Sequence, residues 1–235
     1  MVQIDNVYQK VLAICNKEQR GYITPQEFNL FADRAQNEIY ENYFQQLHMA
    51  QTRPKSQEVY IDNRESIEHK LEPFFNQDTL TITTTGLAVT DVPLNSARII
   101  SVTNKTTNEP VSKVDHGELH YILANPLTKP NSTRRIYIVD KNNDLQFYPA
   151  PSELMDNGYD INYYTKPTQP YWAWVLVGEE ALYNQSGTVN FQIHFSEEES
   201  LVSRILMLAG VSIKHPDVQQ AGAMDIQLIK QQQNS

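Results

Sequence analysis

Residues 24–47 read TPQEFNLFADRAQNEIYENYFQQL, and this stretch carries a strong helix signal. Thr24 can accept a hydrogen bond from the third helical amide, Pro25 suits the first helical position, and Glu27 can reach back to the cap. Apolar residues then recur every three or four positions in two neighbouring stripes: Phe28, Phe31, Ala32, Ala35, Ile39 and Tyr43, and beside them Tyr40, Phe44 and Leu47. The pattern predicts a helix from about residue 25 to about residue 50, with an apolar face that needs more than one packing partner.

The same periodicity predicts a helix at the start of the chain. Its apolar stripe consists of Ile4, Val7, Tyr8, Val11, Leu12 and Cys15. A lone cysteine on such a stripe is most often a small core residue, so we expect Cys15 to be buried rather than to act as a nucleophile.

Helices are also expected at the end of the chain. Ser196 to Glu199 indicates a second capping box, and Leu201 to Ala209 supplies an apolar face that Gly210 should end. A final helix is expected from Pro216 to Leu228. It decays into a polar tail, residues 230–235.

The middle of the chain follows the period of β-strands. Residues 51–78 form a charged connector with a possible helical piece around Ile67 and Leu71. Beyond them, alternation predicts strands, and the clearest of these is Val189 to Phe195. The other expected strands are Leu80 to Thr84, Ile99 to Thr103, Ile136 to Val139, Leu145 to Tyr148, Ile161 to Thr165 and Trp174 to Val177, with a short helix at Asp115 to Leu123.

These elements predict an α+β fold in which terminal helices form a helical bundle around an inserted antiparallel β-rich region. The expected parts are an N-terminal helical part (1–78), an inserted β-rich domain (79–195), and C-terminal helices that complete the bundle (196–235). The expected bundle core is Phe28, Phe31, Ile39, Tyr43, Leu201, Ile205 and Leu208.

Composition excludes several classes of protein. The chain has 235 residues, 40% of them hydrophobic, which is enough for a sizeable core. With 19 Lys and Arg against 28 Asp and Glu, the net charge is −9, and this balance disfavours a dedicated nucleic-acid binder. A single cysteine excludes an intramolecular disulfide framework. Neither a membrane-spanning run nor a signal peptide is expected from the sequence.

Two segments imitate metal sites. Asn16 to Glu27 has the glycine and glutamate of a calcium loop, but Asn16 replaces the first aspartate and Arg20 would repel the ion. His116 and His120 have the i, i+4 spacing of zinc ligands, but Gly117 stands where a zincin has glutamate. We therefore expect a helix cap in the first case and a solvated helical turn in the second.

No motif for bond-making chemistry is present. The sequence lacks a Gly-x-Ser-x-Gly elbow, a P-loop and a Gly-x-Gly-x-x-Gly fingerprint. We expect a protein that is not an enzyme, with no catalytic residue, no metal and no cofactor.

Aromatic residues concentrate between Tyr163 and Trp174. Core packing is the first interpretation, a protein interface the second, and stacking on a sugar or base the third. Tyr171 and Trp172 are the expected inter-subunit contact. An alternative function is a carbohydrate- or ligand-binding β module in which Trp172 and Trp174 stack on the ligand, and a third is a metal hydrolase centred on His116 and His120.

Several motifs also resemble a known family. In chain order they are NKEQRGYITPQEFN (16–29), Ala35-Gln36, Glu38 to Glu41, Tyr163 to Pro167 running into Trp172, and Leu208 to Lys214 with Pro216. Together they resemble virion structural proteins from tailed phages of the crAss-like and related marine groups. The resemblance touches both ends and the late β region, and it transfers no catalytic residue.

The resemblance implies a subunit of a neck or connector ring that joins portal to tail around the DNA path. It implies a homo-oligomeric ring, twelvefold where it matches the portal, in contact with portal and other neck or tail proteins. Genomic DNA would pass without specific binding, and no membrane would be involved. The expected location is the virion, after synthesis in the cytoplasm of a host bacterium. Such adaptors commonly combine a helical bundle with an inserted β part.

Overall fold

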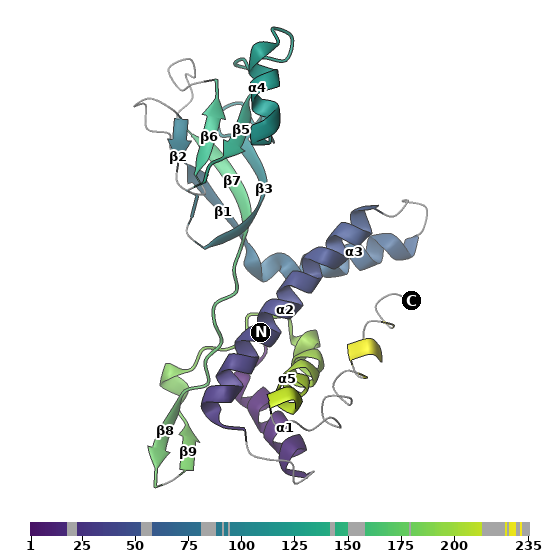
Figure 1. Ribbon diagram of the computed structural model, residues 1–235, viewed down its shortest axis with the longest axis vertical. Coiled ribbons are helices and arrows are strands. Elements are labelled where there is room, and N and C mark those ends of the chain that lie inside the picture. The colour runs from purple at the N-terminus through teal and green to yellow at the C-terminus, as the bar shows by residue number, and fades with distance from the viewer. Residues whose placement is uncertain are drawn as a thin grey trace. The chain divides into compact units, whose positions relative to one another are not determined.

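The computed structural model describes residues 1–17, 23–52, 58–80, 88–90, 92–93, 95–141, 144–149, 158–178, 180–212, 224, 226–228 and 231 (Figure 1). The chain forms two compact units. One combines Met1–Pro73 with Pro167–Ser235 and is mainly helical, and the other, Phe74–Lys166, is mainly β. The predicted α+β class is confirmed.

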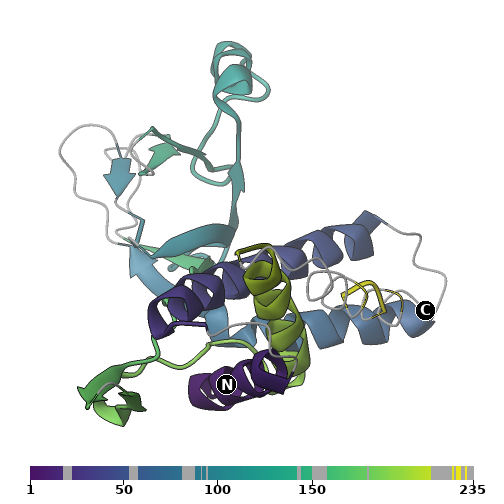
Figure 2. The same ribbon diagram turned by 60° about the horizontal axis from the view of Figure 1, so that its bottom comes forward.

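The helical unit is built from α1 (Ile4–Lys17), α2 (Pro25–Thr52), α3 (Glu58–Leu71) and α5 (Glu198–Ser212). In this unit α5 packs against α1 and α2, and α3 packs against α2 (Figure 2). The capping box that opens α2 is confirmed. The Glu27 amide donates to Thr24 Oγ1 at 3.3 Å, and the Thr24 amide donates to Glu27 Oε2 at 3.0 Å.

The expected bundle core is largely confirmed. Phe28, Ile39, Tyr43, Leu201, Ile205 and Leu208 are all buried, whereas Phe31 is half-buried. Cys15 is buried as well, and burial raises the pKa of its thiol. The burial of these side chains has one cause: the helical period places them on the faces where α1, α2 and α5 meet.

The inserted β region is narrower than predicted, because residues 167–195 belong to the helical unit. Buried amide side chains of α2 tie this segment down. The Gln36 side chain donates to the Thr168 carbonyl at 2.8 Å and accepts from the Gln192 amide at 3.1 Å. The segment contains a two-stranded hairpin of β8 (Trp174–Val177) and β9 (Glu180–Tyr183), which projects away from the helices of its unit in both views (Figures 1 and 2).

The β unit holds a seven-stranded sheet. In spatial order its strands are β1 (Phe75–Leu80), β7 (Tyr159–Thr165), β3 (Ser96–Asn104), β4 (Pro110–Lys113), β5 (Ile136–Val139), β6 (Leu145–Tyr148) and β2 (Ala88–Thr90). The sheet is mixed rather than purely antiparallel, since β4 and β5 run parallel. The reason is the crossover through α4 (His116–Ala124), which returns the chain to the same end of the sheet.

The β unit has apolar clusters on both faces of this sheet, since Tyr137 of β5 belongs to one cluster and its neighbours Ile136 and Ile138 belong to the other. Its largest cluster contains Leu80, Val92, Val102, Val111, Tyr137, Leu145, Phe147, Tyr159, Ile161 and Tyr163. A smaller cluster of Val114, Ile136 and Ile138 is covered by Leu119 and Ile122 of α4. The unit therefore has an apolar core of its own.

Four predicted features differ from the structure. Val189 to Phe195 is not a strand: Val189 and Phe191 form isolated bridges to Tyr171 and Val2, and among the described residues this segment pairs with no strand. The alternation still sets burial, since Phe191 and Ile193 are buried. Ser196 does not cap α5; instead His194 caps the 3-10 turn η4 (Phe195–Glu197), and its Nδ1 accepts from the Ser196 amide.

The strand expected from Leu80 to Thr84 instead begins at Phe75 and is described only as far as Leu80. Gly210 does not end α5, which continues to Ser212. The predicted final helix and polar tail lie mostly outside the described residues. The connector helix around Ile67 and Leu71 is confirmed as part of α3.

Candidate interaction surface

The hairpin of β8 and β9, residues 174–183, is called the tongue below. Trp174 pairs with Tyr183 and Leu176 with Ala181, so these residues share one face. Val175 pairs with Leu182 and Val177 with Glu180, and they form the other face. Both faces are thus mainly apolar, whereas a hairpin lying on a core usually has one polar face.

The tongue exposes this apolar surface in the isolated chain. Leu176 is 68% exposed, and Val175, Val177, Leu182 and Tyr183 are exposed as well. An isolated two-stranded hairpin is at best marginally stable in water, and contiguous exposed apolar side chains mark sites of interaction. The tongue pairs with no further strand among the described residues, so both of its edges offer backbone groups to a partner.

Aromatic side chains anchor the base of the tongue. The Trp172 ring lies 4.4 Å from Tyr8 and 6.3 Å from Trp174, centroid to centroid. Its indole N–H donates to Asp5 Oδ1 at 2.9 Å. Tyr183 also stacks on Trp172, at 5.9 Å. The tongue therefore projects from a cluster of packed aromatic rings.

These contacts correct the expected role of Trp172. It is 2% exposed and belongs to the core of the helical unit, so it cannot serve as a surface contact or stack on a ligand. Tyr171, in contrast, is exposed beside Trp174, with ring centroids 6.0 Å apart. Core packing, the first interpretation of the aromatic residues between Tyr163 and Trp174, is confirmed for Trp172.

The tongue as an exposed surface was not predicted from the sequence. The prediction of a strand at Trp174 to Val177 is confirmed, but the exposure of Val175, Leu176 and Val177 was not anticipated. A signal existed, because four consecutive apolar residues in a strand imply burial on both faces. Within the isolated chain that burial is missing, which is why the tongue is a candidate interface.

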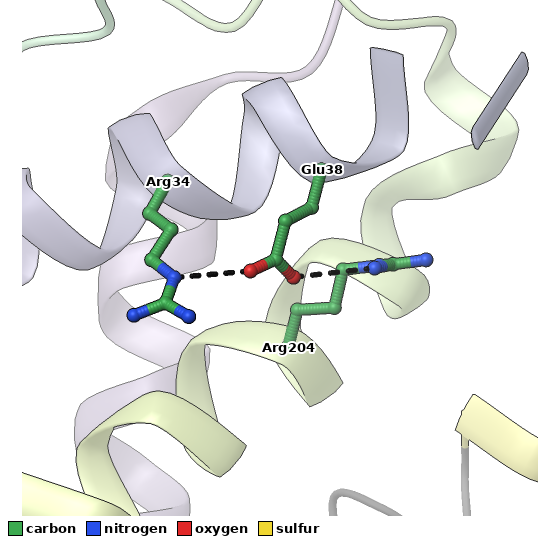
Figure 3. A network of polar contacts seen from close by, with 3 residues as sticks. All are labelled: Arg34, Glu38 and Arg204. Atoms are coloured by element: carbon green, nitrogen blue, oxygen red, sulfur yellow. Dashed lines mark hydrogen bonds and ion pairs between the residues drawn. The ribbon is translucent and has the colours of Figure 1, made fainter. Parts of the chain in front are cut away.

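A polar groove lies elsewhere on the helical unit, between α2 and α5. It has a volume of about 620 Å³ and is lined by Asp33, Arg34, Asn37, Glu38, Glu41, Asn42, Gln45 and Arg204. Figure 3 shows its central network, in which Glu38 bridges two arginines. Arg34 Nε lies 3.0 Å from Glu38 Oε1, and Arg204 Nη1 lies 3.4 Å from Glu38 Oε2. Charges of both signs compensate each other here, so the network clamps α2 to α5 and provides no paired nucleophile and base.

The two segments that imitate metal sites do not assemble a set of metal ligands in the described residues. His116 Nε2 lies 2.8 Å from the Val139 carbonyl oxygen, and His120 lies on the exposed side of α4 beside Tyr121. In the segment that imitates a calcium loop, residues 18–22 lie outside the described residues, and the hydrogen bond from the Thr24 hydroxyl lowers the pKa of the Glu27 carboxyl. Within the described residues, no group of three or more His, Cys, Asp or Glu side chains is placed to hold a metal ion.

Comparisons with known proteins add no assignment. No protein-family model matches the sequence, and no curated protein is detectably similar to it. Among the helices of the described part of the chain, none combines the length and the apolar character needed to cross a membrane.

Proposed function

We propose that this chain is a non-enzymatic structural subunit that assembles with neighbouring subunits through the tongue. The observation that supports this proposal is a hairpin with exposed apolar side chains on both faces, held by an aromatic base. Side chains of this kind are stabilised when a partner removes them from water, at roughly 25 cal/mol per Å² of apolar surface.

The assembly we propose is a neck or connector ring of a tailed phage, between portal and tail, around the DNA path. A ring subunit needs two different side faces, because a heterologous contact that closes on itself makes a ring. The net charge of −9 suits a subunit that surrounds DNA without binding it, since a basic lumen would retain the duplex by counterion release.

The finer features of this proposal come from the family resemblance. They are twelvefold symmetry, contacts with portal and other neck or tail proteins, and location in the virion. The helical bundle with an inserted β unit agrees with such adaptors in architecture.

The alternative, a carbohydrate-binding module, loses one of its two tryptophans because Trp172 is buried. Tyr171, Trp174 and Tyr183 remain at the base of the tongue, where a glycan could still reach Tyr171. A glycan-binding screen of the purified chain distinguishes the two functions, since a solitary chain that binds glycans supports the alternative.

The test of the main proposal is the mass of the purified chain in solution with the substitution Leu176→Asp. We expect the parent to form a uniform oligomer and Leu176→Asp to dissociate it. Leu30→Asp is the matched control, because Leu30 is a leucine of the same unit with almost the same exposure, 67% against 68%. A chain that stays solitary alone and with candidate partner proteins, or an oligomer that Leu176→Asp leaves intact, contradicts the proposal.

A further inference from the structure

A second exposed apolar surface lies on the β unit. It consists of α4 and the turns that follow it, residues 116–134, and is called the knob below. Leu127 is 89% exposed and Tyr121 is 76% exposed. The knob projects from one end of the sheet of its unit in both views (Figures 1 and 2).

Hydrogen bonds within the knob hold Leu127 in this exposed position. The Leu127 amide donates to Asn125 Oδ1 at 3.0 Å, and the Thr128 hydroxyl donates to the Ile122 carbonyl at 3.2 Å. Asn131 Oδ1 then accepts from the Arg134 amide at 2.7 Å. An ordered turn that keeps a leucine in water has the geometry of a preformed contact site, because little ordering entropy is lost on binding.

The tongue carries acidic residues, whereas the part of the knob that contains Tyr121 and Leu127 carries basic ones. The one acidic residue of the knob is Glu118, in the first turn of α4. From Pro167 to Ile193 the charged residues are Glu179 and Glu180, with no Lys, Arg or Asp. From Leu119 to Val139 they are Lys129, Arg134 and Arg135, with no Asp or Glu. Glu180, Lys129 and Arg134 are exposed, whereas Arg135 is buried.

We propose that the tongue of one copy of this chain binds the knob of a second copy. This inference rests on the proposed function and names the partner of the tongue. Leu127 and Tyr121 pack on the face of the tongue that carries Glu180, where Val175 and Leu182 supply the apolar contacts. The pairing of Glu180 with Lys129 or Arg134 orients the contact. Two different patches meet, so the contact is heterologous and its rotation determines whether a ring closes or a filament grows.

A mixing experiment tests the contact directly. One sample carries Leu182→Cys and another carries Leu127→Cys, both in a Cys15→Ala background, and a flexible bismaleimide is added to each sample and to their mixture. We expect cross-linked dimers in the mixture and little cross-linking in either sample alone. Efficient cross-linking of Leu182→Cys alone overturns the inference in favour of a tongue-to-tongue contact, while self-assembly through the tongue survives.

Charge reversal gives an independent readout on the full chain. Glu180→Lys alone and Lys129→Glu with Arg134→Glu should each weaken assembly roughly tenfold in the dissociation constant, and their combination should restore it. Glu65→Lys and Lys105→Glu, exposed positions outside both surfaces, are the controls. An oligomer that Leu176→Asp dissociates but that no charge reversal affects overturns the knob as partner and leaves the proposed function standing. A parent chain that stays monomeric contradicts both the contact with the knob and the proposed function.

Discussion

At the scale of single residues, Asn29 shows how α2 holds the segment that carries the tongue. Its side chain donates to the Trp172 carbonyl at 3.2 Å, and the Trp172 amide donates back to Asn29 Oδ1 at 2.8 Å. Asn29 and Trp172 are both buried. The Asn29 side chain thus makes the two hydrogen bonds that a neighbouring strand would make to Trp172. The backbone N–H and carbonyl of Trp172 both depend on it for their partner.

We expect Asn29→Ala to lower the free energy of unfolding by roughly 2–4 kcal/mol, because it leaves two buried backbone groups without their partner. Urea unfolding followed by tryptophan fluorescence measures the change. Asn37→Ala is the control on the same helix, since Asn37 is exposed and its side chain donates to Asp33 Oδ1 at 3.2 Å, one turn away on α2. Equal effects of the two substitutions would argue against a special role for Asn29.

His194 gives the helical unit a pH dependence. Burial lowers its pKa from the ordinary 6.5, and His69, Lys70 and the N-terminus lower it further, against an opposing effect of Glu197. The neutral ring accepts from the Ser196 amide through Nδ1, which a protonated ring cannot do. The stabilising contribution of His194 is therefore complete above the unfolded pKa and is lost as the pH falls through the lower folded pKa.

The expected result is a free energy of unfolding that decreases below about pH 6.5 more steeply in the parent than in His194→Gln. Glutamine can still accept through its side-chain oxygen but does not titrate. Urea unfolding at a series of pH values measures both slopes, and His69→Gln in both backgrounds separates the contribution of the neighbouring ring, 5.4 Å away. Identical slopes for the parent and His194→Gln would contradict this account.

At the scale of elements, an ion pair connects α3 to the start of α5. Lys70 Nζ lies 2.7 Å from Glu197 Oε1, with side chains 18% and 7% exposed. The ammonium also lies 5.8 Å from the centre of the Tyr43 ring. Glu197, which the sequence predicted as part of a capping box, is instead buried in the 3-10 turn that precedes α5.

Lys70→Met should destabilise the chain by about 3 kcal/mol, because it leaves the Glu197 carboxylate buried without its cation. Adding Glu197→Leu should recover most of that loss, since two apolar groups can replace a buried pair. Arg64→Met, which removes an exposed pairing with Glu68, should cost about 0.5 kcal/mol or less. Thermal and urea unfolding of the four proteins completes the comparison, and a double variant no more stable than Lys70→Met would refute the argument.

The sequence predicted α1, α2 and the strands β3, β5, β6, β7 and β8 well, because their periodicity and caps act locally. It failed where pairing depends on distant segments. Val189 to Phe195 alternates like a strand, but whether a strand lies beside it is decided by the tertiary fold. The parallel pairing of β4 with β5 likewise depends on the path of the α4 crossover.

The candidate site was only partly predictable for a related reason. Aromatic residues between Tyr171 and Trp174 pointed to the correct region, yet Trp172 proved buried and the aliphatic strand beyond it exposed. Trp172 is buried by contacts with Tyr8 and Asp5, which lie more than 160 positions earlier in the sequence. For Asp5 the separation is 167 residues. Spacing within one segment cannot encode such a contact.

At the scale of the whole molecule, the β unit is an insertion whose two ends are neighbours. Phe75 pairs with Tyr164 in the first register position of β1 and β7, and the Thr165 hydroxyl donates to the Phe74 carbonyl at 3.2 Å. Its apolar core is made of its own residues. The chain can therefore be divided at this point with little change to either core.

We expect residues 74–166 to fold alone, with a cooperative urea transition and tyrosine signals in near-ultraviolet circular dichroism. The helical unit, with residues 74–166 replaced by a short Gly-Ser linker, should keep its helical signal.

The first fragment carries the knob and the second carries the tongue. If these two surfaces are partners, neither fragment should self-assemble, whereas a mixture of both should form a complex that added salt weakens. Glu180→Lys in the helical fragment should weaken that complex, and Glu65→Lys in the same fragment should not. A helical fragment that oligomerises as well as the full chain would show that the tongue needs no knob.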